Sequence, residues 1–340
     1  MIFQTYNFSQ VEVVLIDTQV SNLRLVRSVL DRMGIKKVHP FLNMSGVMES
    51  VVASVPDLLL IDADDAEGEA LKFVRWLRTD INSPNPFMCV IATTWQPTTT
   101  LFNRVTNSGV DDLLVSSISS KQIILDRVNS LIYERRKFIV TADYIGPDRR
   151  KTAREETPSV PMLDAPNILQ MKVTGQWKRL AEREQIASAM VWVNTQKTIR
   201  DAIQIAILVE FAAPGLLQTP PERQTFDHLL RILGFIEDLQ RRLVGHPKEE
   251  SISINCKNIQ TLIEQMCSTQ VQSVAESNLD QIKTLILNLM CTLSPDRSPE
   301  DLSSEVANFV AAYRIRLAQQ VSDKAAQLVV EPFQPFPVKR

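Results

Sequence analysis

Two short apolar runs that each end in an aspartate constrain the fold of this chain more than any other feature. The run Pro-Asp-Leu-Leu-Leu-Ile-Asp ends at Asp62, and the run Val-Glu-Val-Val-Leu-Ile-Asp ends at Asp17. Runs of Leu, Ile and Val without polar alternation are typical of parallel strands that are buried on both faces. Because ligands of open α/β sheets bind at the carboxyl ends of the strands, we expect Asp17 and Asp62 to lie together at one rim.

Strand-like runs alternate with helix-period segments from residue 11 to about residue 135. The helical stripe over 22–33 is followed by Gly34, which is typical of a helix C-cap. Such alternation predicts right-handed crossovers and a five-stranded parallel sheet with helices on both faces, the flavodoxin-like arrangement. The expected strands cover residues 11–17, 36–39, 57–62, 87–94 and 112–115, and further helices are expected around 47–52, 71–77 and 118–133.

Composition narrows the class of protein. The chain has 340 residues and a formal net charge of −2, which favours two domains and predicts no field strong enough to recruit nucleic acid. No apolar run is long enough for a membrane span, and the N-terminus lacks the pattern of a signal peptide. The cysteines show no metal-binding spacing, so we expect reduced thiols in a cytoplasmic protein; they are Cys89, Cys256, Cys267 and Cys291.

Several motifs in the first 135 residues resemble, in the right order, the receiver domain of two-component response regulators. They are the first strand exit at 16–22, the strand at 56–62, Glu67-Gly68, the strand end at 91–94 and the segment Gly-Val-Asp-Asp-Leu-Leu-Val at 109–115. The resemblance implies an aspartyl phosphate chemistry with bound Mg²⁺. It also implies a sensor histidine kinase or a phosphotransfer protein as partner, together with other signalling proteins.

The resemblance gives individual residues a role. Asp62 matches the phospho-acceptor and Asp17 the first metal-binding acid. Asp64, just past the third strand, is a further candidate for the metal, because hard cations take carboxylate ligands. Thr94, or Thr93 if the strand register shifts by one residue, matches the switch hydroxyl that contacts a phosphoryl group.

Two positions depart from the receiver pattern. Thr18 stands where the family usually has a second acid, and Ser116 stands where it usually has a lysine. A serine hydroxyl can contact a phosphoryl oxygen but cannot neutralise its charge, so we expect impaired phosphorylation. Asp64 or Asp65 is placed to restore the metal site. The simpler interpretation of Asp62 is a carboxylate that caps a helix or pairs with a neighbour.

The rest of the chain differs in character. Residues 139–175 are polar and interrupted by prolines, which predicts a linker, and residues 331–340 predict a flexible tail. Residues 176–330 have helical periodicity and predict an all-helical domain, with Pro214-Gly215 as a break. The run Thr-Pro-Pro-Glu at 219–222 predicts a capping box, and Ser298-Pro299 predicts another helix start.

His228 is the residue of the helical half with the clearest potential for chemistry. The run Asp-His-Leu-Leu-Arg-Ile at 227–232 faintly resembles the core of histidine phosphotransfer domains, although a helical histidine packed in a bundle explains it too. No phosphate loop, metal cluster or nucleophilic triad is evident, so we expect no enzyme. The amphipathic stripes are compatible with a homodimer and equally with a simple core.

These observations favour a two-component response regulator whose receiver is coupled to a helical protein-interaction output. Two alternatives stay open at this stage. One is a pseudo-receiver scaffold that works without phosphorylation, and the other is a phosphotransfer protein that uses His228.

Overall fold

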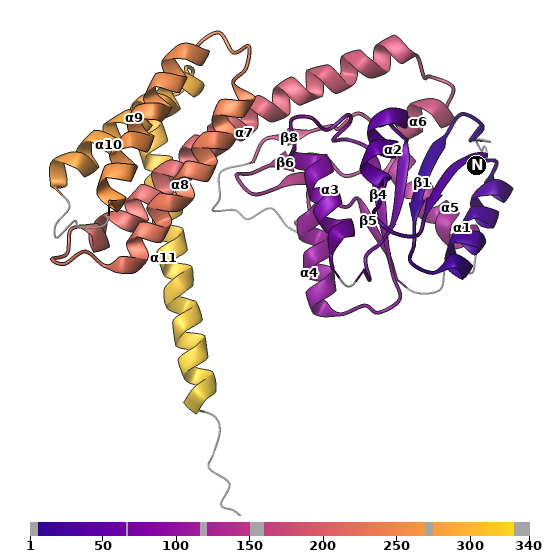
Figure 1. The fold of residues 1–340 in the computed structure, drawn as a ribbon, viewed down its shortest axis with the longest axis horizontal. Helices are drawn as coiled ribbons and strands as arrows, with labels where there is room; N and C mark the ends of the chain where they lie inside the picture. Colours follow the sequence, from indigo (N-terminus) through magenta and orange to yellow (C-terminus); the bar gives the residue numbers. More distant parts are fainter. Residues whose placement is uncertain (1–5, 66, 116–120, 150–159, 269–274, 330–340) are drawn as a thin grey trace, which may run out of the picture. The chain divides into compact units, whose positions relative to one another are not determined.

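A computed structural model describes residues 6–65, 67–115, 121–149, 160–268 and 275–329 of the chain (Figure 1). The chain divides into two compact units, Met1–Lys197 and Thr198–Arg340. Each unit has its own hydrophobic core, and the two are described separately below.

The first unit is built on a five-stranded parallel sheet with the strand order β2-β1-β3-β4-β5. This confirms the predicted flavodoxin-like arrangement. The carboxyl ends of β1, β3 and β4 are neighbours in that order, which is where the two aspartates were expected. The strands are β1 (Glu12–Ile16), β2 (Lys37–Phe41), β3 (Leu58–Asp62), β4 (Cys89–Thr94) and β5 (Asp112–Val115).

Helices cover both faces of the sheet, because successive strand side chains point to opposite sides. In β1, Val13 and Leu15 join a core with α1 and α5, whereas Val14 and Ile16 join a core with α2, α3 and α4. The helices are α1 (Val20–Met33), α2 (Val47–Ser54), α3 (Glu69–Thr79), α4 (Thr99–Ser108) and α5 (Lys121–Tyr133).

Helix ends follow local chemistry. α1 ends at Gly34, whose φ of 98° lies in the left-handed region, so the predicted C-cap is confirmed. Sequence periodicity did not predict α4. Its N-cap is Thr98, whose hydroxyl accepts a hydrogen bond of 3.1 Å from the Leu101 amide.

The segment expected to be a linker contains regular structure. A small three-stranded antiparallel sheet, in the order β7-β6-β8, and a short helix fall within 138–173. The physical reason is a set of apolar residues scattered among the polar ones, which form a core with the start of α7. Residues 150–159 lie outside the described residues. The elements are β6 (Phe138–Val140), β7 (Ile145–Pro147), β8 (Met162–Leu163) and α6 (Ile168–Val173).

Three buried charged residues and one aromatic ring connect this small sheet to the large one. We call them the Asp111 cluster; its members are Arg78, Asp111, Arg135 and Phe138. Arg78 donates to Asp111 Oδ2 at 2.8 Å, and Arg135 donates to Asp111 Oδ1 at 2.9 Å. The Phe138 ring of β6 lies 5.2 Å and 5.0 Å from the two guanidinium carbons. The cluster therefore joins β6 to the ends of α3, β5 and α5 through charge pairing and cation–π contacts.

The second unit is helical in its described residues, which confirms the predicted all-α region. Its core is formed by α7 (from residue 198 onward), α8, α9, α10 and α11. Ile232, Ile236, Ile259 and Ile286 are among its buried residues. The helices are α7 (Arg179–Leu216), α8 (Arg223–Arg242), α9 (Glu249–Cys267), α10 (Glu276–Leu293) and α11 (Pro299–Val329).

Two details of the helical unit differ from expectation and one agrees. Pro214 lies inside the last turn of α7 and does not end it. The capping box predicted at 219–222 is wrong, because α8 begins at Arg223 and its N-cap Glu222 makes no side-chain cap bond. The predicted start at Ser298 is confirmed, since its hydroxyl accepts a 3.1 Å bond from the Asp301 amide.

In the described parts of the chain, no helix combines the length and apolarity needed to cross a bilayer.

Candidate functional site

Strand register brings Asp17 and Asp62 to the same rim. Ile16 of β1 pairs with Ile61 of β3, so the next residue of each strand is an aspartate at the carboxyl edge. Both aspartates are buried, with exposed fractions of 2% and 3%. This register agrees with the expectation that the two aspartates lie at one edge of the sheet.

Asp17 is crowded by negative charge. Burial raises the pKa of its carboxyl above the ordinary value of 3.8, and the charges of Asp62 and Asp64 raise it further. The Gln19 amide, at 2.8 Å from Asp17 Oδ1, and the Asn22 side chain, at 3.3 Å, act in the opposite direction. The carboxylates of Asp62 and Asp64 therefore lie close enough to Asp17 for their charges to act on its pKa.

Both oxygens of Asp62 already accept hydrogen bonds. The Thr18 hydroxyl donates to Asp62 Oδ2 at 3.1 Å, and the Asp64 amide donates to Asp62 Oδ1 at 3.0 Å. Thr18, which departs from the receiver pattern, thus contacts the candidate acceptor through a neutral hydroxyl. These donors orient the Asp62 side chain, and no lysine, arginine or histidine among the described residues forms an ion pair with it.

Asp64 holds the end of β4. Its Oδ1 accepts a 2.5 Å bond from the Thr94 hydroxyl, and its Oδ2 accepts a 2.6 Å bond from the Trp95 amide. The Thr94 hydroxyl in turn accepts from the Gln96 amide at 3.1 Å. This contact was not predicted from the sequence. The sequence pattern that could have revealed it is an acid two residues after one strand, combined with a threonine at the end of the next strand.

The other candidates of the first unit take different places. Thr93 pairs with Asp62 in register, and its hydroxyl reaches only the Ile61 carbonyl, at 3.5 Å. Thr94 is therefore the threonine directed toward the acidic rim. Asp65 accepts from the Glu69 amide at 2.5 Å and supports the start of α3. Ser116 lies outside the described residues.

The Mg²⁺ that the resemblance implied would meet fewer acids at this rim than in the usual receiver pattern, because Thr18 replaces the second acid. Within the described ranges, no group of three or more His, Cys, Asp or Glu side chains is arranged to hold a metal ion. Both oxygens of Asp64 accept hydrogen bonds from the end of β4. Asp65 Oδ2 accepts from the start of α3, whereas its buried Oδ1 has no hydrogen-bond partner. Thr18 adds no charge to the rim. Mg²⁺ takes oxygen ligands in octahedral geometry, most of them waters beside one or two carboxylates, so Asp17 and Asp62 are the side chains of this rim that would hold it.

His228 lies on α8 of the helical unit and is half-buried. Its Nδ1 is buried and has no hydrogen-bond partner, and its ring centroid is 6.4 Å from that of Phe211. Ile232, one helical turn later, is fully buried and faces the core.

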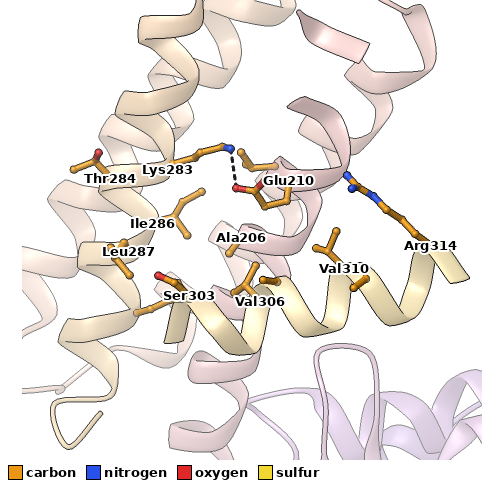
Figure 2. A pocket seen from close by; sticks show the side chains of 14 residues that line it. Ala206, Glu210, Lys283, Thr284, Ile286, Leu287, Ser303, Val306, Val310 and Arg314 are labelled. Carbon is orange, nitrogen blue, oxygen red and sulfur yellow. Dashed lines mark ion pairs between the residues drawn. The ribbon is translucent and has the colours of Figure 1, made fainter. Parts of the chain in front are cut away.

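The helical unit contains a groove of about 560 Å³ between α7, α10 and α11 (Figure 2). Apolar side chains such as Val306 and Ile286 line it. On one wall Lys283 and Glu210 form an ion pair of 2.8 Å, and Arg314 lies at the other end, as Figure 2 shows. The groove can accommodate an apolar group beside a guanidinium, and no sequence motif pointed to it.

No family model and no curated protein matches the chain. Solved structures match its first part. A two-component response regulator from Clostridium difficile is 18% identical over 37% of this chain and 98% of its own, with a TM-score of 0.33. A chemotaxis protein from Vibrio cholerae is 15% identical over 35% and 96%, with a TM-score of 0.32. A response regulator from Thermotoga maritima is 18% identical over 36% and 97%, with a TM-score of 0.31.

These likenesses concern the fold of the first part of the chain. They cover the five-stranded sheet and its helices, and they leave the helical unit unassigned.

Proposed function

We propose that the protein is a response regulator of two-component signal transduction, with Asp62 as the phospho-acceptor and the helical unit as a protein-interaction output. The observation that supports this best is the rim itself. Asp17 and Asp62 end neighbouring parallel strands, and Thr94 ends the next strand in the sheet. Three strand ends thereby supply a nucleophile, a second acid and a hydroxyl at one edge.

The chemistry at this rim is a phosphoryl transfer to a carboxylate. An oxygen of Asp62 forms a bond to phosphorus, and the donor departs with the electron pair of the bond that breaks. The donor is a phosphohistidine of a sensor kinase or phosphotransfer protein, or a small acyl phosphate. We expect the reaction to be slow, because both Asp62 oxygens are hydrogen-bonded and Thr18 provides no charge.

Acetyl phosphate treatment followed by mass spectrometry tests the acceptor. We expect slow incorporation of one phosphoryl group on the wild-type chain, mapped to Asp62, and none on Asp62→Asn. Asp80→Asn, at the end of α3 and away from the rim, is the matched control and should behave like the wild type. Incorporation that persists in Asp62→Asn would exclude Asp62 as the acceptor.

A phosphorylation-independent pseudo-receiver is the second candidate. It is favoured by the hydrogen bonds that already occupy Thr94 and Trp95 and by the lack of a three-acid group in the part of the chain that the structure describes. Acetyl phosphate with and without added Mg²⁺ separates the two candidates. Labelling of the wild type under neither condition favours the pseudo-receiver.

The output role of the helical unit is tested on the full chain by hydrogen-exchange mass spectrometry. We expect phosphodonor treatment to change exchange in peptides from α8 to α11 of the wild type and to leave them unchanged in Asp62→Asn. If phosphodonor treatment changed hydrogen exchange only in the first unit of the wild type, that result would argue against an output coupled to the receiver.

A further inference from the structure

We propose that the Asp64 carboxylate is a built-in anion that holds the switch of the receiver, in the place of a phosphoryl group. This inference rests on the proposed function, because it concerns the regulation of the same rim. It follows from what Asp64 contacts, and it gives a role to an acid that does not fit a metal site.

The contact has the geometry of anion recognition. Asp64 Oδ1 accepts a hydrogen bond from the Thr94 hydroxyl at 2.5 Å, and Asp64 Oδ2 accepts one from the Trp95 amide at 2.6 Å. Both distances lie at the short end for hydrogen bonds to a charged acceptor. A hydroxyl and a backbone amide are also the neutral donors that suit phosphoryl oxygens. Asp64 therefore satisfies both donors at the end of β4 without any modification of the chain.

The hydroxyl of Thr94 is fixed by this contact. It donates to Asp64 and accepts from the Gln96 amide at 3.1 Å, so its rotation is set from both sides. The same carboxylate thus ties the loop after β3 to the turn after β4.

Asp64 and a phosphoryl group on Asp62 would compete for the same donors. The Asp64 amide donates to Asp62 Oδ1 at 3.0 Å, so the two side chains start from adjoining backbone. Two anions that share a partly dehydrated rim repel each other. Phosphorylation of Asp62 therefore requires Asp64 to release Thr94 and Trp95, and we expect this release to slow the reaction.

Amide hydrogen exchange at Trp95 measures the contact directly. A hydrogen bond to a charged group contributes about 1.5–3 kcal/mol, which corresponds to roughly 10- to 100-fold in exchange protection. We expect Trp95 to lose that protection in Asp64→Ala and part of it in Asp64→Asn, which keeps one acceptor oxygen. Glu67→Gln removes a charge from the same loop and should leave Trp95 protected, since Glu67 is exposed. Unchanged protection in Asp64→Ala would overturn the inference.

Two further measurements make the result decisive. Circular dichroism shows whether Asp64→Ala stays folded, and if it does not, Asp64→Asn decides the outcome. In the acetyl phosphate assay, Asp64→Ala should label Asp62 about tenfold faster than the wild type, from the lost hydrogen bonds. Labelling of none of these proteins would overturn the proposed function, whereas an unprotected Trp95 amide in the wild type would overturn the role of Asp64.

Discussion

Crowded carboxylates determine the chemistry of the rim at the scale of single residues. Asp17 and Asp62 are both nearly inaccessible to solvent. The charges of Asp62 and Asp64 add to the effect of burial, and together they raise the pKa of the Asp17 carboxyl. Like charges held together in a partly buried site cost folding free energy unless donors or a cation compensate them. Here amides and hydroxyls compensate the charges only in part, so burial first and repulsion second keep the pKa of Asp17 above its ordinary value.

Removing the Asp17 charge should therefore stabilise the fold. The pKa of Asp17 is raised in the folded state, so its ionised form destabilises the protein above that pKa, and the effect disappears as pH falls below the unfolded value of 3.8. We expect Asp17→Asn to raise Tm at about pH 7 and to equal the wild type near pH 3. Asp31→Asn, an exposed acid on α1, is the control. A lower Tm for Asp17→Asn at neutral pH would contradict this account.

The buried cysteines give a second prediction at this scale. Burial raises the pKa of Cys89 to about 11, and burial likewise raises that of Cys256 to about 11. Because the thiolate is the reactive form, both should resist a thiol reagent at about pH 8 until the protein unfolds. Mass spectrometry of the labelled peptides, with and without denaturant, checks this. Full labelling of Cys89 in the folded protein would show that β4 is open to solvent.

At the scale of elements, the Asp111 cluster connects β6 to the ends of α3, β5 and α5 through buried charges. Burial disfavours the charge of Asp111, but Arg135 and Arg78 outweigh it and lower the pKa of Asp111. All three side chains are almost fully buried, with exposed fractions of 0%, 1% and 6% for Arg78, Asp111 and Arg135. Removing one member of such a group leaves the others as uncompensated buried charges.

Asp111→Asn should destabilise the protein by about 3–5 kcal/mol at neutral pH, measured by urea unfolding. The pKa of Asp111 is depressed in the folded state, so its contribution is present above the unfolded value of 3.8 and is lost as pH falls through the folded value. Asp112→Asn removes the neighbouring acid, whose partner Arg127 is half-exposed, and should cost at most about 1 kcal/mol. Equal losses in the two variants would argue against the cluster.

Sequence periodicity predicted the elements that have a clear apolar pattern. The strands and α1 were predictable because β3 is a continuous buried run and Gly34 marks a helix end. α4 was missed because Leu101 and Val105 are the apolar residues it buries, too few for a visible stripe. The small sheet was missed because its strands are only 2–3 residues long and its polar composition is typical of linkers.

The candidate site was predictable in outline and not in detail. Strand ends decide where Asp17, Asp62 and Thr94 lie, so the periodic pattern predicted their position. The partner of Asp64 depends on side-chain rotation and on the turn after β4, which no sequence period encodes. The capping box at 219–222 failed for a similar reason, since the backbone conformation and not the residue type decided where α8 begins.

At the scale of the whole molecule, the chain combines a receiver-like unit with a helical unit that has its own core. The proposed signal starts at the rim of the first and is read out by the second. The groove beside Arg314 belongs to the helical unit and lies on the surface formed by α7, α10 and α11.

The rate of phosphoryl incorporation at Asp62, compared between the wild type and Asp64→Ala by site-resolved mass spectrometry, tests the central claim most directly. If Asp64 holds the switch hydroxyl in a working receiver, Asp62 labels slowly in the wild type and about tenfold faster in Asp64→Ala. Equal rates in the two proteins, or labelling at any residue other than Asp62, would contradict it.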